Sequence, residues 1–65
     1  MRILVNGAWH EIAARQLAGT LEELGYHGRV VATAVNGEFV PVEARMRREL
    51  ADGDRLEVLA PMQGG

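Results

Sequence analysis

The most chemically informative feature of the sequence is its end, where the chain finishes in Gly64-Gly65. Glycines contribute no side chain, so the group available for chemistry is the α-carboxylate of Gly65. Glycine also reaches backbone conformations that are closed to other residues, so a di-glycine tail can enter a narrow channel and present its carboxylate to a nucleotide. A chain end without function has a similar composition, because termini are commonly small and poorly ordered. The di-glycine alone leaves both interpretations open.

Length and composition predict one small domain. The chain has 65 residues, of which 48% are hydrophobic, and it contains no cysteine, which excludes a disulfide framework and thiolate metal sites. Its net charge of −2 is opposite to the basic excess typical of nucleic-acid-binding modules. Residues 1–5 do not resemble a signal peptide, and no segment approaches the about 20 apolar residues that span a membrane. We therefore expect a soluble cytoplasmic protein without nucleic-acid or membrane partners.

Other residues that could form a site give weaker signals. The arginines within residues 45–48 are flanked by glutamates, a pattern that favours a solvated mixed face over a phosphate-binding patch. His10 and His27 have no carboxylate or cysteine at metal-ligand spacing, so we expect no metal site. Trp9 could anchor a partner, since tryptophan is enriched at binding hot spots, but packing at a sheet edge is the favoured interpretation.

The elements that must position the tail are mostly strands. Asn-Gly pairs at 6–7 and 36–37 each follow a β-rich run, and this pair suits the type I′ hairpin turn because both central residues need a positive φ. Asp52-Gly53-Asp54 marks a third turn. The predicted strands cover residues 2–5, 8–13, 30–35, 38–40 and 55–60.

One helix is expected between the two hairpins. An apolar stripe at i, i+4 and i+7 predicts a helix over residues 16–24, with Gly19 inside it. Alternatively, Thr20 and Glu23 form a capping box that would start the helix at Thr20. A second, short helical or 3₁₀ segment is expected within residues 42–50. The stripe consists of Leu17, Leu21 and Leu24.

The order of these elements predicts an α+β fold of the β-grasp, ubiquitin-like type. Two strands, a helix, two strands and a final strand can form a mixed sheet of four to five strands that one helix covers on one face. We expect residues 1–60 to form this domain and residues 61–65 to form a flexible tail. In such a fold the final strand leads directly into the tail, which favours a functional role for Gly64-Gly65.

Five stretches of the sequence match one known family in order and at that family's spacing: residues 1–7, 21–26, 35–41, 52–58 and 61–65. On these stretches the sequence resembles the ThiS family of bacterial sulfur carriers along essentially its whole length. Residues 42–45 depart from the family pattern, in which a basic residue comes first and a tryptophan often lies near Arg45.

This resemblance implies a carrier with no bound cofactor, which acts as a protein co-substrate. In the family, an E1-like adenylyltransferase of the ThiF type uses ATP and Mg²⁺ to convert the terminal carboxylate, here that of Gly65, to an acyl-adenylate. A sulfur from a persulfide donor displaces AMP. The resulting thiocarboxylate supplies sulfur to thiazole synthase of the ThiG type, for the thiazole ring of thiamine. The residues expected to thread the partner's active site are Met62, Gln63 and Gly64.

A docking face for these partners is expected beside the tail. If Leu56 and Val58 point to the helix, strand alternation places Glu57 and Leu59 on the opposite face. Leu59 is then an exposed apolar residue and a candidate partner contact. A core role for Leu59 is the alternative, because a shift of one residue in register exchanges the two faces.

Rival functions share parts of this pattern. The small subunit of molybdopterin synthase is a sulfur carrier with the same fold, and a ubiquitin-like modifier would place Gly65 in an isopeptide bond. A binding module with an incidental tail is the alternative from another class. An enzyme is disfavoured because no nucleophile, base and orienting group can be assembled. The seven basic residues are all arginine, so the chain's own surface offers an activated tail no lysine.

Overall fold

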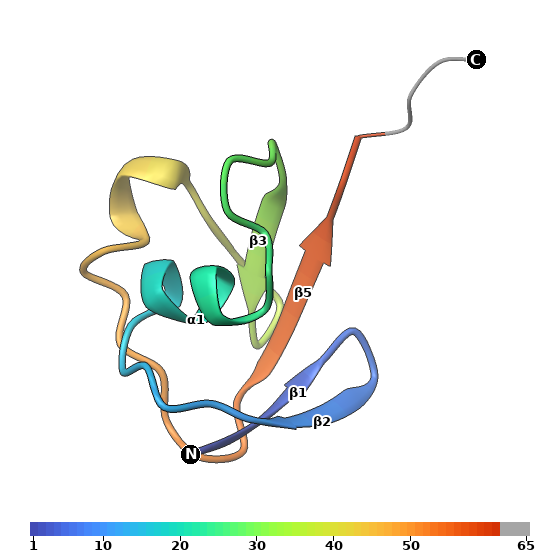
Figure 1. Ribbon diagram of the computed structural model, residues 1–65, viewed down its shortest axis with the longest axis vertical. Helices are drawn as coiled ribbons and strands as arrows, with labels where there is room; N and C mark the ends of the chain where they lie inside the picture. Colours follow the sequence, from blue (N-terminus) through green and yellow to red (C-terminus); the bar gives the residue numbers. More distant parts are fainter. Residues whose placement is uncertain (62–65) are drawn as a thin grey trace.

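The computed structural model describes residues 1–61, and the predicted tail residues Met62, Gln63, Gly64 and Gly65 lie outside them. A five-stranded mixed sheet carries α1 on one face (Figure 1), which confirms the predicted α+β fold of the β-grasp type. The elements are β1 (Arg2–Val5), β2 (Ala8–Glu11), α1 (Leu17–Glu23), β3 (Ala32–Val35), β4 (Glu38–Val40), the 3₁₀ segment η1 (Val42–Ala44) and β5 (Arg55–Leu59).

The last strand lies in the middle of the sheet, whose order is β2-β1-β5-β3-β4. It runs parallel to β1, with Val5 opposite Leu56, and antiparallel to β3, with Thr33 opposite Val58. Each of the two neighbours is also half of an antiparallel hairpin, β1 with β2 and β3 with β4. In Figure 1, β5 carries the chain away from the N-terminus toward the tail. The strand that leads to the tail is therefore held on both sides.

Both predicted hairpin turns are confirmed by their backbone angles. Asn6 and Asn36 have φ values of 48° and 51°, and the glycines that follow them, Gly7 and Gly37, both have a φ of 85°. These are the left-handed conformations that type I′ turns require at both central positions. The third turn, at Asp52-Gly53-Asp54, is also confirmed, with a φ of 89° at Gly53.

The helix follows the apolar stripe rather than the capping box. Helix α1 begins at Leu17 with Gln16 as N-cap, so the alternative start at Thr20 is wrong. Thr20 is instead buried inside the helix, and its hydroxyl donates to the Gln16 carbonyl at 3.0 Å. Gly19 has a packing reason to be glycine, because a Cβ there would lie 2.9 Å from the Cβ of Ala14.

A single apolar core fills the space between α1 and the inner face of the sheet. Leu17 and Leu21 contribute from the helix, and their buried side chains meet alternate residues of the strands. Thr33 is the buried polar residue of the sheet, and its hydroxyl is satisfied by donating to the Val40 carbonyl at 2.8 Å. The buried apolar residues are Ile3, Val5, Ile12, Leu17, Leu21, Val31, Val35, Val40, Leu50, Leu56 and Val58.

The last strand ends at Leu59, one residue before the predicted end. Two other strands are two residues shorter than predicted, because side chains bond to the backbone groups beside them. Strand β2 was expected to reach residue 13 but ends at Glu11. The next free N–H groups, those of Ala13 and Ala14, donate to the carboxylate of Glu23 at 2.7 to 3.0 Å. The third strand was expected from residue 30 but begins at Ala32. The carbonyl just before it, that of Val31, accepts from the guanidinium of Arg45 at 2.6 Å.

The expectation of a solvated arginine face over residues 45–48 is wrong for Arg45. This residue follows η1, which confirms the predicted short helical segment, and it is partly buried. Its Nε donates to the Thr33 hydroxyl at 3.1 Å, in addition to the bond with the Val31 carbonyl. Arg48 is also half-buried and lies 3.7 Å from the carboxylate of Glu38. These contacts tie the segment after β4 to the sheet.

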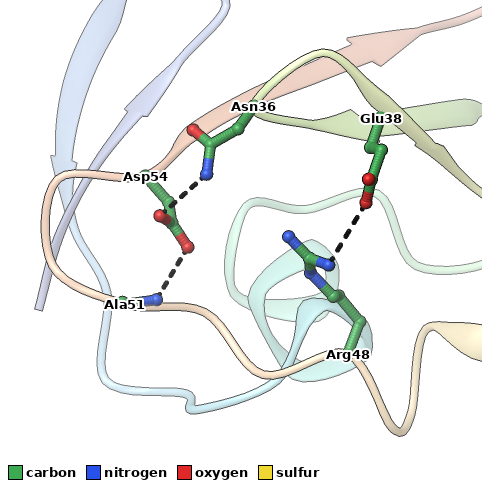
Figure 2. Close-up of polar contacts among 5 residues, drawn as sticks. All are labelled: Asn36, Glu38, Arg48, Ala51 and Asp54. Atoms are coloured by element: carbon green, nitrogen blue, oxygen red, sulfur yellow. Dashed lines mark hydrogen bonds and ion pairs between the residues drawn. The ribbon is translucent and has the colours of Figure 1, made fainter.

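The start of β5 is fixed by polar contacts between the third turn and the second hairpin (Figure 2). The carboxylate of Asp54 accepts from the side-chain amide of Asn36 at 3.0 Å and from the backbone N–H of Ala51 at 2.8 Å. Asn36 in turn accepts from the N–H of Arg55, the first residue of β5, at 2.9 Å. Figure 2 also shows Arg48 directed toward Glu38 near this network.

Candidate functional site

The residue alternation of β5 separates core from surface as the sequence predicts. Leu56 and Val58 are 0% and 5% exposed and point into the core below α1. Leu59 is 70% exposed on the opposite, open face of the sheet, so the alternative core role for this residue is wrong. Leu59 also lies two residues before Pro61, where the described part of the chain ends. The structure thus places an exposed apolar side chain at the root of the tail.

Leu59 belongs to a larger apolar area, which we call the tail-side patch: Val30, Ala32, Ala34, Phe39 and Leu59. The strand register brings these residues together, since Ala32 lies opposite Leu59 and Ala34 opposite Phe39. Phe39 is 68% exposed and Val30 is 80% exposed. The small alanines lie between the larger side chains and leave a shallow hollow on the open face. Such an exposed apolar area at a sheet face is typical of a protein-binding surface.

The tail-side patch continues to the point where the tail begins. A second shallow hollow is lined by Val30, Leu59, Ala60 and Pro61, among others. Any surface that covered the patch would therefore also contact the root of the tail. The sequence analysis found Leu59 but missed Phe39 and Val30. The position of Phe39 depends on the pairing of β3 with β4, which no local pattern specifies. Val30 was expected inside a strand, but β3 begins only at Ala32.

The rest of the open face carries charged and aromatic side chains. Glu57, opposite Ala34, borders the hollow. At the far edge of the sheet, Trp9 on β2 is 49% exposed, and the guanidinium carbon of Arg2 lies 4.7 Å from the centroid of its ring. This places Trp9 on an edge strand, as the favoured interpretation predicts. The apolar half of the open face is thus the half next to the tail.

The titratable side chains of residues 1–61 include Glu22 and Glu23 of α1, which bond to the segments beside the helix. No group of three His, Cys, Asp or Glu side chains in this part of the chain could hold a metal ion. His27 is exposed and pairs with Glu22 at 2.6 Å. The hydrogen bonds that Glu23 accepts from Ala13 and Ala14 lower the pKa of its carboxyl below the ordinary 4.5. These bonds hold the segment between β2 and α1 against the end of the helix. Among the same residues, no helix is long and apolar enough to cross a membrane.

Comparison with known proteins assigns this fold and tail to a family. The model of the ThiS family matches residues 3–65, a range that begins inside β1 and extends through the helix and the other four strands to Gly64-Gly65. The chain belongs to the ThiS family. The sulfur carrier protein ThiS of Thermus thermophilus is 39% identical over 64 residues, which are 97% of this chain and 98% of that protein. The crystal structure of the thiamine biosynthesis protein ThiS from Geobacter metallireducens superposes with a TM-score of 0.82 at 29% identity, and the match covers 100% of both chains.

A second kind of relative is much longer than this chain. The thiazole synthase of Paramagnetospirillum magneticum is 35% identical over 66 residues, which cover 100% of this chain but 20% of that protein. The ThiS-family chain therefore spans one fifth of the length of that relative. The family match confirms the predicted membership among thiamine sulfur carriers. The predicted roles of Met62, Gln63, Gly64 and Gly65 stay predictions, because these residues lie outside the described part of the structure.

Proposed function

We propose that this ThiS-family chain carries sulfur on the terminal carboxylate of Gly65. The observation that carries the proposal is the extent of the family match, which runs through the sheet and on to Gly65. An α-carboxyl with an ordinary pKa of about 3.5 is ionised at neutral pH and can act as a nucleophile. The tail supplies this group, and the domain supplies a surface by which a partner can hold it.

The proposed chemistry takes place in three steps at the partner proteins. One carboxylate oxygen of Gly65 attacks the α-phosphorus of ATP, pyrophosphate leaves, and an acyl-adenylate forms. A persulfide then attacks the acyl carbon and AMP leaves. A thiol splits the resulting acyl disulfide, which releases the thiocarboxylate and leaves a disulfide between the thiol and the donor. The E1-like adenylyltransferase must supply Mg²⁺ and cationic groups to stabilise the phosphoryl transfer.

Thiazole synthase is the proposed acceptor of the sulfur. The thiazole synthase of Paramagnetospirillum magneticum contains a segment similar to this entire chain. Joining a carrier to the enzyme that consumes its cargo raises their effective concentration, which supports the proposal that the two activities are sequential. The sulfur would then be delivered to the thiazole ring of thiamine.

Both partners must approach the tail-side patch, because the tail is short. Four residues follow Pro61, and a fully extended chain advances at most about 3.5 Å per residue, so the carboxylate of Gly65 stays within about 14 Å of Pro61. An active site that binds this carboxylate must lie within the same distance. The enzyme surface around that site therefore reaches the apolar area that contains Leu59 and Phe39, whose burial would favour docking.

Intact-protein mass spectrometry tests the proposal. The chain is incubated with a ThiF-type adenylyltransferase that is active on its own carrier, together with ATP, Mg²⁺ and a persulfide donor. We expect one oxygen of the chain to be replaced by sulfur, and fragmentation to place the change at Gly65. A chain that lacks Gly64 and Gly65 is the control and should keep its mass. Isopeptide-linked products would instead indicate a protein modifier, and an unchanged mass in the full chain would exclude the sulfur carrier.

A further inference from the structure

The asparagines of the two hairpin turns both bond to β5, but at opposite ends of the strand. Asn36 accepts from the N–H of Arg55, the first residue of the strand, at 2.9 Å. Asn6 accepts from the N–H of Val58 at 2.9 Å and donates to the carbonyl of Val58 at 3.1 Å. The two turns have nearly the same backbone conformation, with φ values of 48° and 51° at the asparagines. They therefore differ mainly in the part of β5 that they hold.

The side chain of Asn6 bonds to the end of β5 at the position where a further residue of β1 would otherwise pair. The parallel pairing of β1 with β5 ends at Val5, and the backbone N–H of Asn6 still donates to the Leu56 carbonyl at 2.9 Å. The main chain then turns away into the hairpin. The side-chain amide of Asn6 continues the ladder by one step, because it satisfies both backbone polar groups of Val58 on this side. On the other side, β3 pairs with Val58 and Leu59.

We propose that Asn6 is a positioning residue for the chemistry at Gly65, an inference that rests on the proposed function. By fixing Val58 on the β1 side, Asn6 sets the direction in which Leu59 and Pro61 leave the sheet. A partner docked on the tail-side patch then receives the tail from a defined starting point. Without the amide, the end of β5 is held only by β3. The conformational entropy of ordering this end must then be lost each time the carboxylate is placed in the partner's active site.

Matched glycine variants test this role. Asn6→Gly and Asn36→Gly each keep a residue that accepts positive φ, and each removes the acceptor of one β5 N–H. We expect similar losses in melting temperature for both. With a ThiF-type adenylyltransferase, we expect Asn6→Gly to lower kcat about fivefold, the effect of having to order about one additional residue, with KM changed less than about twofold. Asn36→Gly should keep kcat within about twofold of the wild type when the two glycine variants are compared under conditions of equal stability.

A second measurement links the kinetic effect to the contact itself. Amide hydrogen exchange at Val58 should become faster in Asn6→Gly, whereas in Asn36→Gly exchange should become faster at Arg55. Asn6→Asp keeps the acceptor for the Val58 N–H and loses the donor to its carbonyl, so we expect intermediate exchange and an intermediate kcat. This variant also replaces Asn6→Gly in the kinetic test if the glycine protein does not fold.

The outcomes separate this inference from the proposed function. A wild-type kcat in Asn6→Gly, together with faster exchange at Val58, would overturn the positioning role. An equal loss of kcat in Asn36→Gly would overturn it as well, because the effect would then reflect general stability. If the wild-type chain itself is not adenylated, the proposed function fails. A loss of kcat specific to Asn6→Gly with an unchanged KM supports the inference.

Discussion

At the scale of single residues, the absence of an atom is as consequential as the presence of one. Gly19 lacks a Cβ because one would lie 2.9 Å from the Cβ of Ala14, where α1 meets the preceding connection. We expect another reason for glycine at position 64, namely that a tail without a Cβ there can pass through a narrow channel in its partner. The first constraint acts on folding and the second on function, so substitutions at the two glycines should have separable effects.

We predict that Gly64→Val leaves the fold intact but blocks activation. A β-branched residue adds bulk and restricts the backbone where the channel is narrow, so the rate of adenylation should fall at least about tenfold. The melting temperature should stay at the wild-type value, because the tail follows the last strand of the sheet. Gly64→Ala adds a Cβ without branching and should show a smaller loss. Adenylation of Gly64→Val at the wild-type rate would contradict the threading model.

At the scale of elements, the sequence predicted those helices and turns whose conformation depends on neighbouring residues. The Asn-Gly pairs identified both hairpins because few residues tolerate a positive φ, and the leucine stripe identified α1 because burial selects the helical period. The misses involve distant partners. Arg45 bonds to groups 12 and 14 positions away, and Asn6 bonds to a residue 52 positions away. The sequence around a residue does not identify such distant hydrogen-bond partners, because they depend on how the strands pair.

Glu23 is a further case in which an element depends on a distant side chain. Its carboxylate accepts the N–H groups of Ala13 and Ala14 and so joins the end of α1 to the segment that enters it. This lowers its pKa in the folded state below the ordinary 4.5. The carboxylate therefore stabilises the fold above pH 4.5, and this contribution is lost as the pH falls through the lowered folded-state pKa.

We accordingly predict that Glu23→Gln destabilises the protein more at pH 7 than in acid. Urea unfolding should give a lower midpoint than the wild type at pH 7, and the difference should shrink as the pH falls below 4.5. Glu43→Gln is the control, since Glu43 is an exposed glutamate of η1, away from this connection. A difference for Glu23→Gln that stays constant with pH would show that the carboxylate charge is not what stabilises this connection.

At the scale of the whole molecule, the two faces of the sheet differ in what covers them. The inner face and α1 enclose the core, whereas the open face carries the tail-side patch next to the exit of the chain. Strand alternation predicted the exposure of Leu59. The patch as a whole could not be predicted, because it requires Phe39 of β4, the alanines of β3 and Leu59 of β5 to lie in register.

We predict that Leu59→Glu weakens partner binding without destabilising the domain. A side chain that is 70% exposed contributes little to the core, so the melting temperature should stay near that of the wild type. The dissociation constant with the adenylyltransferase should rise about tenfold or more, because a charge would be buried in the apolar contact. Met46→Glu is the control, since Met46 is 73% exposed outside the patch and should bind normally. A large fall in melting temperature for Leu59→Glu, or equal binding losses in both variants, would remove the patch as the docking surface.

The central place of β5 also has a mechanical consequence. The first and last strands are parallel neighbours, so tension between the N-terminus and the tail pulls β1 and β5 along their lengths in opposite directions. The bonds from Leu4 to Asp54 and from Asn6 to Leu56 are then loaded in shear together, and they cannot open one after another as in a zipper. On the other side, β3 adds a second row of bonds to the same strand. Forced unfolding is governed by the barrier to this simultaneous rupture, so we expect the domain to resist tension applied between its two ends.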